Sequence, residues 1–319
     1  MNPLYLTEGD VAATLSIHDA LGLVEDAARA LGEERAQNKP RQRAYLESSV
    51  IQVLAASYAG RMGHKTYTVA MKGRGARFWH LMFNDNGEML SIIEADVLGQ
   101  IRTGAASGVA TRYLARPDAK TLGMIGTGWQ ARTQIEAVVH ARPISRVLVY
   151  GRDPKRRAEF CEQMSEKISV KLEPVESAHD AVADADVVCT MTSSSTPVFD
   201  GAWLRNGTHV NAAGSNRANA QEIDVETVAR AAIVAVEDVA QAQVESGDLR
   251  SAADSGRWNW DSVVTLADIV AAKVPARTSD DQITLFESLG IGLWDLAAAS
   301  HVFDRCIAEG RGVRLPFPS

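Results

Sequence analysis

The stretch that decides the fold runs Thr121-Leu122-Gly123-Met124-Ile125-Gly126-Thr127-Gly128-Trp129-Gln130-Ala131. An apolar, strand-like run leads here into a G-x-G-x-x-A string that opens a helical segment. In such a unit the first glycine permits a tight turn, the second lets the backbone approach a pyrophosphate, and the small last residue lets helix and strand pack. The helix N-terminus then stabilises the phosphate charge. We therefore predict a dinucleotide site at Gly126, Thr127, Gly128, Trp129, Gln130 and Ala131, with a purely structural glycine turn as the alternative.

The chain beyond Pro117 alternates short apolar runs with helical or loop segments. The runs are TLGMIG, RVLVY, DVVCT, HVNAAG and AIVAVE. Strands that are apolar on both faces are typical of a parallel sheet covered by helices on each side. Together with the glycine-rich string they predict an α/β fold, a Rossmann dinucleotide-binding domain. We expect residues 248–260 to be irregular.

The chain before this region has a different texture. Ser16 to about Gln37 has helical periodicity, and Ser16 with Asp19 resembles a capping box. Residues 50–93 form short runs separated by the turn-like strings KGRG (72–75) and NDNG (84–87), which predicts an antiparallel sheet.

Two helices are expected to connect these regions. Residues 102–115 form a small-residue helix, and Arg116-Pro117 ends it because proline cannot continue a helix, so we take this point as a domain boundary. A long amphipathic helix from Phe286 to Glu309 is expected to carry the chain back to the first domain.

Composition excludes several classes of protein. The 319 residues are 46% hydrophobic and 23% charged, as in an ordinary globular protein. The net charge of −7 provides no basic surface for a nucleic acid or an anionic membrane. Three widely spaced cysteines and seven histidines without an HxH or HExxH pair predict no disulfide framework and no metal site. With no basic leader and no apolar run near about 20 residues, we expect a cytoplasmic protein.

The residues after the second strand bear on the choice of cofactor. Gly151-Arg152 follows the run 147–150, where an NAD site usually carries an acidic residue for the ribose. Arg152, with Arg157 behind it, can neutralise a 2′-phosphate because guanidinium binds phosphate bidentately. We therefore predict that NADP(H) is favoured over NAD(H). A strand end shifted by one residue would instead put Asp153 at the ribose and favour NAD.

Sparse cations mark the first domain. Arg41 and Arg43 precede a strand, Lys65 opens the run KTYTV, and Arg102 begins the small-residue helix. Arg102 beside helix N-terminal amides would attract an anion, and a partly buried lysine can polarise a bound group. These residues predict a site for a small carboxylate. For each one alone, a solvated or ion-paired surface cation is the alternative.

Several strings along the chain, taken in order, resemble the ornithine cyclodeaminase/mu-crystallin family. They are Ile101–Ser107 (IRTGAAS), Leu114–Ala119 (LARPDA), Gly126–Ala131, Val210–Asn216 (VNAAGSN), Glu222–Asp224 (EID), Glu245–Asp248 (ESGD) and Phe286-x-Ser288-x-Gly290. The resemblance implies a Rossmann domain, residues 117–290, inserted into an α+β substrate-binding and dimerisation domain formed by both chain ends, residues 1–116 and 291–319. It also implies a homodimer.

The resemblance assigns roles to single residues. It implies that Arg43 or Arg41, Lys65 and Arg102 surround a substrate carboxylate. Thr103, and Thr190 to Thr192, would lie near the cofactor phosphate or nicotinamide.

Two departures separate this chain from true ornithine cyclodeaminases. Ser215 stands where those enzymes have an acidic acid/base residue, and Gln52 stands where they use a glutamate for the distal ammonium of ornithine. The chain is therefore more similar to the mu-crystallin side of the family, which reduces ketimines with NADPH.

The expected reaction is hydride reduction of a C=N bond next to a carboxylate, which converts an imino acid into an amino acid. Lys65 would polarise the imine or donate a proton to the amine, and Ser215 would relay a proton through water. One alternative is an ornithine cyclodeaminase-like enzyme or an alanine-type amino acid dehydrogenase. Another is a nucleotide-binding protein without turnover.

Overall fold

The structure is a computed structural model that describes residues 2–70 and 75–316. The chain folds as two compact units, one of residues 1–102 with 291–319 and the other of residues 103–290. The first division falls inside α3 (Asp96–Leu114), whereas the boundary expected from the sequence lies at its C-terminal end. The assignment of substrate and cofactor to separate domains stays a prediction.

The first unit is built on a sheet in which eight strands of the described chain take part. Its order is β16 (Val313–Arg314), β1 (Leu4–Leu6), β7 (Met89–Glu94), β6 (Ala76–Asn84), β5 (Arg61–Ala70), β4 (Ser49–Tyr58) and β2 (Ala36–Asn38), with β3 (Gln42–Leu46) also paired to β4. All pairs are antiparallel except β1 with β7, so the antiparallel sheet predicted over residues 50–93 is confirmed. The NDNG string forms the turn between β6 and β7, while residues 72–74 of KGRG lie outside the described residues.

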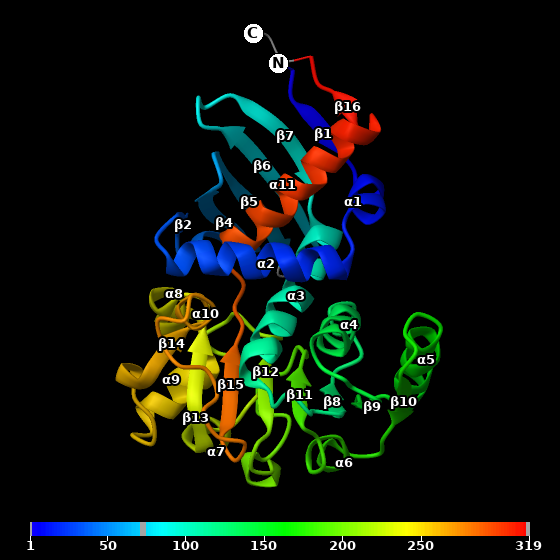
Figure 1. The fold of residues 1–319 in the computed structure, drawn as a ribbon, viewed down its shortest axis with the longest axis vertical. Helices are drawn as coiled ribbons and strands as arrows, with labels where there is room; N and C mark the ends of the chain where they lie inside the picture. Colours follow the sequence, from blue (N-terminus) through cyan, green and yellow to red (C-terminus); the bar gives the residue numbers. More distant parts are fainter. Residues whose placement is uncertain (1, 71–74, 317–319) are drawn as a thin grey trace. The chain divides into compact units, whose positions relative to one another are not determined.

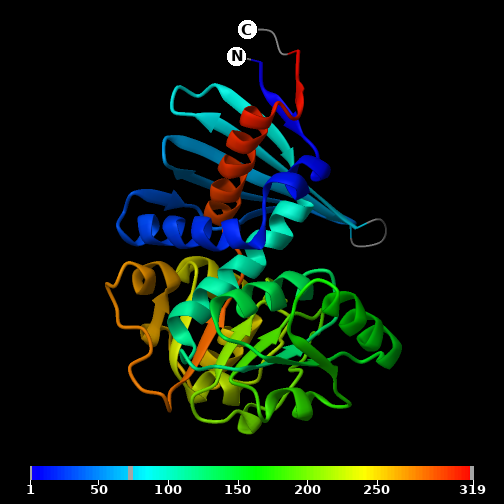
Figure 2. The same ribbon diagram turned by 45° about the vertical axis from the view of Figure 1, so that its right-hand side comes forward.

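Helices α1 (Glu8–Thr14), α2 (Ile17–Gly32) and α11 (Gly292–Glu309) belong to the same unit, and α11 packs across β4, β5 and β6 (Figures 1 and 2). The capping box at Ser16 and Asp19 is confirmed, since each side chain bonds the other's backbone N–H. The predicted end near Gln37 is wrong. The helix stops at Gly32 because Glu34 has a φ of +61° and residues 36–38 pair with β4 instead.

The return helix also begins later than predicted. Phe286 and Glu287 end the strand β15 (Ile283–Glu287), and α11 starts only at Gly292. Every residue of β15 is buried, and the strand pairs with neighbours on both edges, so sheet pairing overrides the helical periodicity there. Gly290 has a φ of +73°, and the chain changes direction there before α11 begins.

The second unit is a fully parallel sheet among the described strands. Its order is β10 (Lys171–Pro174), β9 (Arg146–Tyr150), β8 (Thr121–Ile125), β11 (Val187–Thr190), β12 (His209–Ala212), β15, β13 (Ala231–Val236) and β14 (Val263–Thr265). The five predicted runs form β8, β9, β11, β12 and β13, so the Rossmann-type α/β expectation is confirmed (Figure 1). Cys189 is buried on β11, as expected of a strand residue.

The remaining helices of this unit connect its strands. They are α4 (Ala131–Ala141), α5 (Pro154–Ser165), α6 (Ala178–Val182), α7 (Val225–Arg230), α8 (Val239–Glu245), α9 (Gly247–Asp254) and α10 (Leu266–Val270), with 3₁₀ turns at Gly201–Trp203 and Trp260–Ser262. The irregular segment expected over residues 248–260 is therefore wrong for its first half. Ser246 caps α9 by accepting from the N–H of Leu249, a local signal that the sequence analysis missed.

The strand order fixes where a ligand can bind in the second unit. From β8 the chain proceeds outward through β9 and β10, and then returns to β11 on the other side of β8. This reversal is a topological switch point, and ligands of open α/β sheets bind outside the carboxyl ends of the strands at that place. The relevant residues are those that follow β8 and β11.

Candidate functional site

The glycine-rich turn lies between β8 and α4, in the strand–turn–helix context that its sequence predicts. Gly126 has a φ of +117°, and a Cβ atom there would lie 2.2 Å from the carbonyl oxygen of Met191. A Cβ atom on Gly128 would meet nothing within 4 Å. The first glycine is therefore required by backbone conformation and by packing, and the second leaves its backbone approachable. The turn fits a dinucleotide pyrophosphate.

Arg152 lies just after the end of β9, as predicted. The strand ends at Tyr150, and Arg152 is exposed. Asp153 is the N-cap of α5, and its carboxylate accepts from the N–H groups of Lys155 and Arg156 at 2.9 and 3.1 Å. The carboxylate that would favour NAD is thus engaged in capping the helix.

Arg157 does not lie beside Arg152 on the surface. Its side chain is buried and donates to the carbonyl oxygen of Gly151 at 3.1 Å and to Glu176 at 2.8 Å. Gly151 in turn packs on Thr127, since a Cβ atom there would lie 2.9 Å from that side chain. Arg157 therefore holds the turn that presents Arg152 rather than facing solvent.

Two of the predicted residues, Thr190 at the end of β11 and Thr192 after it, bond one carboxylate, Glu222, for which no role was predicted. The hydroxyl of Thr190 donates to Glu222 Oε2 at 2.9 Å, and Thr192 donates to Oε1 from its N–H at 2.5 Å and its hydroxyl at 2.6 Å. Ser215 is half-buried and accepts from the N–H of Arg217 at 3.3 Å. Thr103 lies in α3, where its carbonyl accepts from Gln134 at 3.4 Å.

In the first unit, Lys65 and Arg102 meet on one buried carboxylate. Asp295 Oδ1 accepts from Lys65 Nζ at 2.8 Å and from Arg102 Nε at 2.9 Å. Lys65 is 3% exposed, Arg102 is 7% exposed and Asp295 is fully buried, so neither cation is a solvated surface residue. Asp295 is not among the residues predicted from the sequence. The signal was present, because it is the one charged residue within residues 288–299.

Two sequence expectations about these cations are wrong in detail. Arg102 does not begin its helix, because α3 starts at Asp96 and Arg102 lies in the second turn. The first N–H groups of α3, at Asp96 and Val97, instead donate to the carboxylate of Glu8 at 2.7 and 2.9 Å. Lys65 lies in the middle of β5 rather than at its start. Side chains alternate between the two faces of a strand, and that of Lys65 lies on the buried face.

Both candidate arginines near the third strand reach the same acceptor. Gln52 Oε1 accepts from Arg43 Nε at 3.2 Å and from Arg41 at 3.4 Å, and the hydroxyl of Tyr67 donates to it at 2.8 Å. Arg41 also donates to the Tyr67 hydroxyl. The ring of Tyr67 lies 5.8 Å from Lys65 Nζ, which links the two groups of cations. We call Arg41, Arg43, Lys65 and Arg102 the cationic cluster.

Burial and neighbouring charges shift the pKa values of Lys65, Asp295 and His80. Burial, together with the positive charge of Arg102, lowers the pKa of Lys65 to about 7, while Asp295 acts to raise it. The pKa of Asp295 lies below its ordinary value because Arg102 and Lys65 outweigh the effect of its burial. Burial also lowers the pKa of His80 to about 4, so this neighbour on β6 is neutral at pH 7. Lys65 can therefore donate or accept a proton near neutrality.

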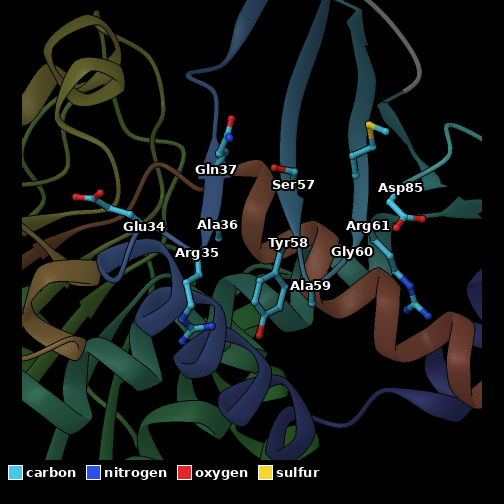
Figure 3. A pocket seen from close by; sticks show the side chains of 11 residues that line it. Glu34, Arg35, Ala36, Gln37, Ser57, Tyr58, Ala59, Gly60, Arg61 and Asp85 are labelled. Atoms are coloured by element: carbon cyan, nitrogen blue, oxygen red, sulfur yellow. The ribbon is translucent and has the colours of Figure 1, made fainter.

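A separate hollow of about 390 Å³ lies in the first unit, around the β2–β4 edge and the β4–β5 turn (Figure 3). It is lined by Glu34–Gln37, Ser57–Met62 and Asp85, none of which was predicted for the site. Arg61 reaches from it toward α11, where it pairs with Asp304 at 2.6 Å. The cationic cluster and the glycine-rich turn contribute no residue to this hollow.

Within residues 2–70 and 75–316, no group of three His, Cys, Asp or Glu side chains is arranged to hold a metal ion. Over the same residues, no helix combines the length and apolarity needed to cross a membrane.

Comparison with known proteins gives the same family from sequence and from structure. The model of the ornithine cyclodeaminase/mu-crystallin family matches residues 1–310. A Δ1-pyrroline-2-carboxylate reductase of Bacillus cereus is 38% identical over 232 residues, which are 72% of this chain and 71% of the relative.

Solved structures also match this chain over nearly its full length, among them the following two. The Thermococcus litoralis Δ1-pyrroline-2-carboxylate reductase, in complex with NADH and L-proline, superposes with a TM-score of 0.93 at 31% identity, covering 98% of this chain and 100% of the other. An archaeal alanine dehydrogenase dimer with bound NAD superposes with a TM-score of 0.94 at 28% identity, covering 100% of both chains.

Proposed function

The chain belongs to the ornithine cyclodeaminase/mu-crystallin family, and from that premise we propose that it is a nicotinamide-dependent reductase of a C=N bond next to a carboxylate, which yields an amino acid. The observation that carries this proposal is the buried group of Lys65, Arg102 and Asp295. It combines cations for a carboxylate with a lysine whose pKa lies near neutrality. The relatives named as pyrroline-2-carboxylate reductases support the same reaction class.

The cationic cluster provides the binding energy for the substrate carboxylate. When Lys65 is protonated, two cations share one oxygen of Asp295, and a bound carboxylate would balance the remaining positive charge in this buried site. Arg102 uses its Nε on Asp295, and a guanidinium has further N–H donors with which to bind a carboxylate. Binding the carboxylate fixes the orientation of the neighbouring imine, which is the main catalytic requirement of this reaction.

Lys65 supplies the proton of the reduction. The imine carbon gains a hydride and the nitrogen ends as an amine, so each turnover consumes one hydride and one proton. Lys65, with a pKa of about 7, is protonated in about half of the molecules at neutral pH, and the protonated form can release its proton to the nitrogen. Before the transfer, the negative charge of Asp295 balances the positive charge of protonated Lys65. The half-buried Ser215 has no charge to contribute, and relaying a proton through water is the role left for it.

The glycine-rich turn is the proposed site of the dinucleotide, with Gly126 and Gly128 at the pyrophosphate and Arg152 at the adenine ribose. The cofactor, when bound, supplies the hydride. We infer that NADP(H) is preferred, because Arg152 is exposed after β9 while the carboxylate of Asp153 is engaged in capping. Both solved relatives hold NAD or NADH, so the two cofactors must be compared directly.

A second candidate function is an alanine-type dehydrogenase, which the archaeal alanine dehydrogenase favours because it matches this chain over its full length. It would use the same site on the imine formed from a 2-oxo acid and ammonia. We also propose a homodimer, the state given for that relative.

The test is the oxidation of NADPH and NADH, followed by nicotinamide absorbance, with Δ1-pyrroline-2-carboxylate, other cyclic imino acids and 2-oxo acids with ammonia or amines. We expect fast oxidation with a cyclic imino acid. Preference for a 2-oxo acid with ammonia would select the alanine-type dehydrogenase. Ammonia release from ornithine without reduction of any imine would select a cyclodeaminase. Binding of either cofactor with no turnover in any assay would leave a nucleotide-binding protein.

A further inference from the structure

One buried carboxylate joins the segments that follow β11 and β12. Glu222 is 1% exposed, and each of its oxygens accepts two hydrogen bonds. Oε1 accepts from the N–H and the hydroxyl of Thr192, while Oε2 accepts from the hydroxyl of Thr190 at 2.9 Å and the N–H of Gly214 at 2.6 Å. All four partners are donors, which is the set that an ionised carboxylate satisfies and an amide cannot.

These segments stand at the switch point. Thr190 ends β11, the neighbour of β8, and Met191 follows it directly. A Cβ atom on Gly126 would lie 2.2 Å from the carbonyl oxygen of Met191, so the first glycine of the turn packs directly on this segment. Residues 191 and 192 are therefore held on one side by the glycine-rich turn and on the other by Glu222.

The segment after β12 also lies close to Glu222, because Gly214 has no side chain. A Cβ atom on Gly214 would lie 2.5 Å from both carboxylate oxygens of Glu222 and 2.5 Å from the nitrogen of Thr192. Only glycine lets the backbone come this close to the carboxylate. Glu222 thus fixes the first residues after two adjacent strands, at the edge of the sheet where a dinucleotide binds in this class of fold.

The backbone of Glu222 is fixed separately from its side chain. The N–H groups of Glu222 and Ile223 both donate to Asp248 Oδ1, at 2.9 and 3.0 Å. Asp248 lies in the first turn of α9 and is 3% exposed. A change in the Glu222 side chain therefore leaves its main-chain anchor in place and acts mainly on the segments of Thr192 and Gly214.

We propose that Glu222 is a positioning residue for cofactor binding, which preorganises the segments after β11 and β12 without touching the cofactor itself. The proposal rests on the proposed dinucleotide site. A preorganised site binds more tightly because less ordering is required at the moment of binding. This role can be distinguished from a general effect on stability. Loss of the Glu222 carboxylate should lower cofactor affinity more than another substitution that destabilises the protein equally.

The test compares Glu222→Gln with Glu237→Gln as a matched control. Glu237 is also buried and accepts from the Ser288 hydroxyl and from the N–H groups of Leu289 and Gly290, at 2.8 to 3.1 Å. The dissociation constants of NADPH and NADH are measured by fluorescence titration without substrate, and Tm is measured for each variant. Charged hydrogen bonds of this kind lead us to expect a loss of roughly tenfold to a hundredfold in cofactor affinity for Glu222→Gln. For Glu237→Gln we expect a change below about twofold.

Further measurements separate the possible failures. Substrate KM at saturating cofactor should stay within about twofold of wild type in Glu222→Gln, and Glu222→Asp should recover part of the cofactor affinity because it keeps the charge. If Glu222→Gln does not fold, Gly214→Ala tests the same contact from the other side and should weaken cofactor binding. Equal affinity losses in the two glutamine variants would overturn the positioning role. A wild-type protein that binds neither dinucleotide would instead overturn the proposed function.

Discussion

Replacing Asp295 with asparagine should shift the alkaline limit of activity to lower pH. Asp295 Oδ1 lies 2.8 Å from Lys65 Nζ, and its charge acts to raise the pKa of Lys65 against burial and Arg102. At that distance the Coulomb energy is about 1.5 kcal/mol even with the dielectric constant of water, which corresponds to about one pKa unit. Because both groups are buried, this figure is a lower bound. The pKa of Lys65 should therefore fall from about 7 by at least about one unit.

The sign follows from the role proposed for Lys65, which is to donate a proton. Protonated Lys65 is the active form, so kcat/KM at saturating cofactor declines as pH rises through its pKa, and in Asp295→Asn the decline begins at lower pH. Other charged or titratable groups act on this lysine: Arg41, His80, Asp96 and Arg102. The same side chains are present in the variant, and His80, whose pKa Asp295 acts to raise, stays neutral at pH 7 without that charge. The imine has its own pKa, but it is the same substrate in both proteins, so the difference between the two profiles reports the enzyme.

A matched control lies on the same helix. Asp304 pairs with Arg61 at the surface of α11, at 2.6 Å, and its side chain is 59% exposed. Asp304→Asn should leave the pH profile unchanged, because exposed ion pairs contribute little and this one lies outside the cationic cluster. An Asp295→Asn variant that loses activity but keeps the wild-type alkaline midpoint would refute the assignment of Lys65 as the titrating proton donor.

Three further predictions address the other parts of the site. Arg102→Ala should lower kcat/KM for the imino acid roughly tenfold to a hundredfold, while the dissociation constant of the cofactor, from fluorescence titration, changes less than about twofold. Arg152→Ala should raise the KM for NADPH about tenfold and leave the KM for NADH nearly unchanged, and equal effects on both would contradict a 2′-phosphate contact. Gly126→Ala should abolish measurable cofactor binding and lower Tm, because its φ of +117° and the 2.2 Å approach to Met191 leave no room for a methyl group.

The parts of the fold that the sequence predicts are those set by local pattern. The turn from Gly126 to Ala131 is flanked by an apolar strand and a helix, and those features are contiguous in the chain. The start of α3 was missed because its first N–H groups are satisfied by Glu8, which lies 88 residues from Asp96 in the sequence. The strand β15 was missed because its pairing with β12 and β13, rather than its periodicity, decides its conformation.

The same distinction applies to the candidate site. The cations were found because a charged residue on a strand or small-residue helix is a chemical outlier that the sequence shows directly. Their common partner, Asp295, was not predicted, because it is separated in the sequence from Lys65 by 230 residues and from Arg102 by 193. Which nitrogen of which arginine reaches Gln52 is likewise a matter of side-chain geometry, which no spacing rule fixes.

Asp295 and Glu222 show why such partners matter for reading a site from sequence. Each is a buried carboxylate on which residues predicted to meet a ligand converge: Lys65 and Arg102 on Asp295, Thr190 and Thr192 on Glu222. In each unit we propose that the buried acid fixes the donors in position and so reduces the ordering that binding would otherwise require. A sequence motif identifies the groups whose chemistry suits the ligand. On these proposals, the ligand affinity of both groups and the protonation state of Lys65 depend on a buried acid that only the folded chain brings to them.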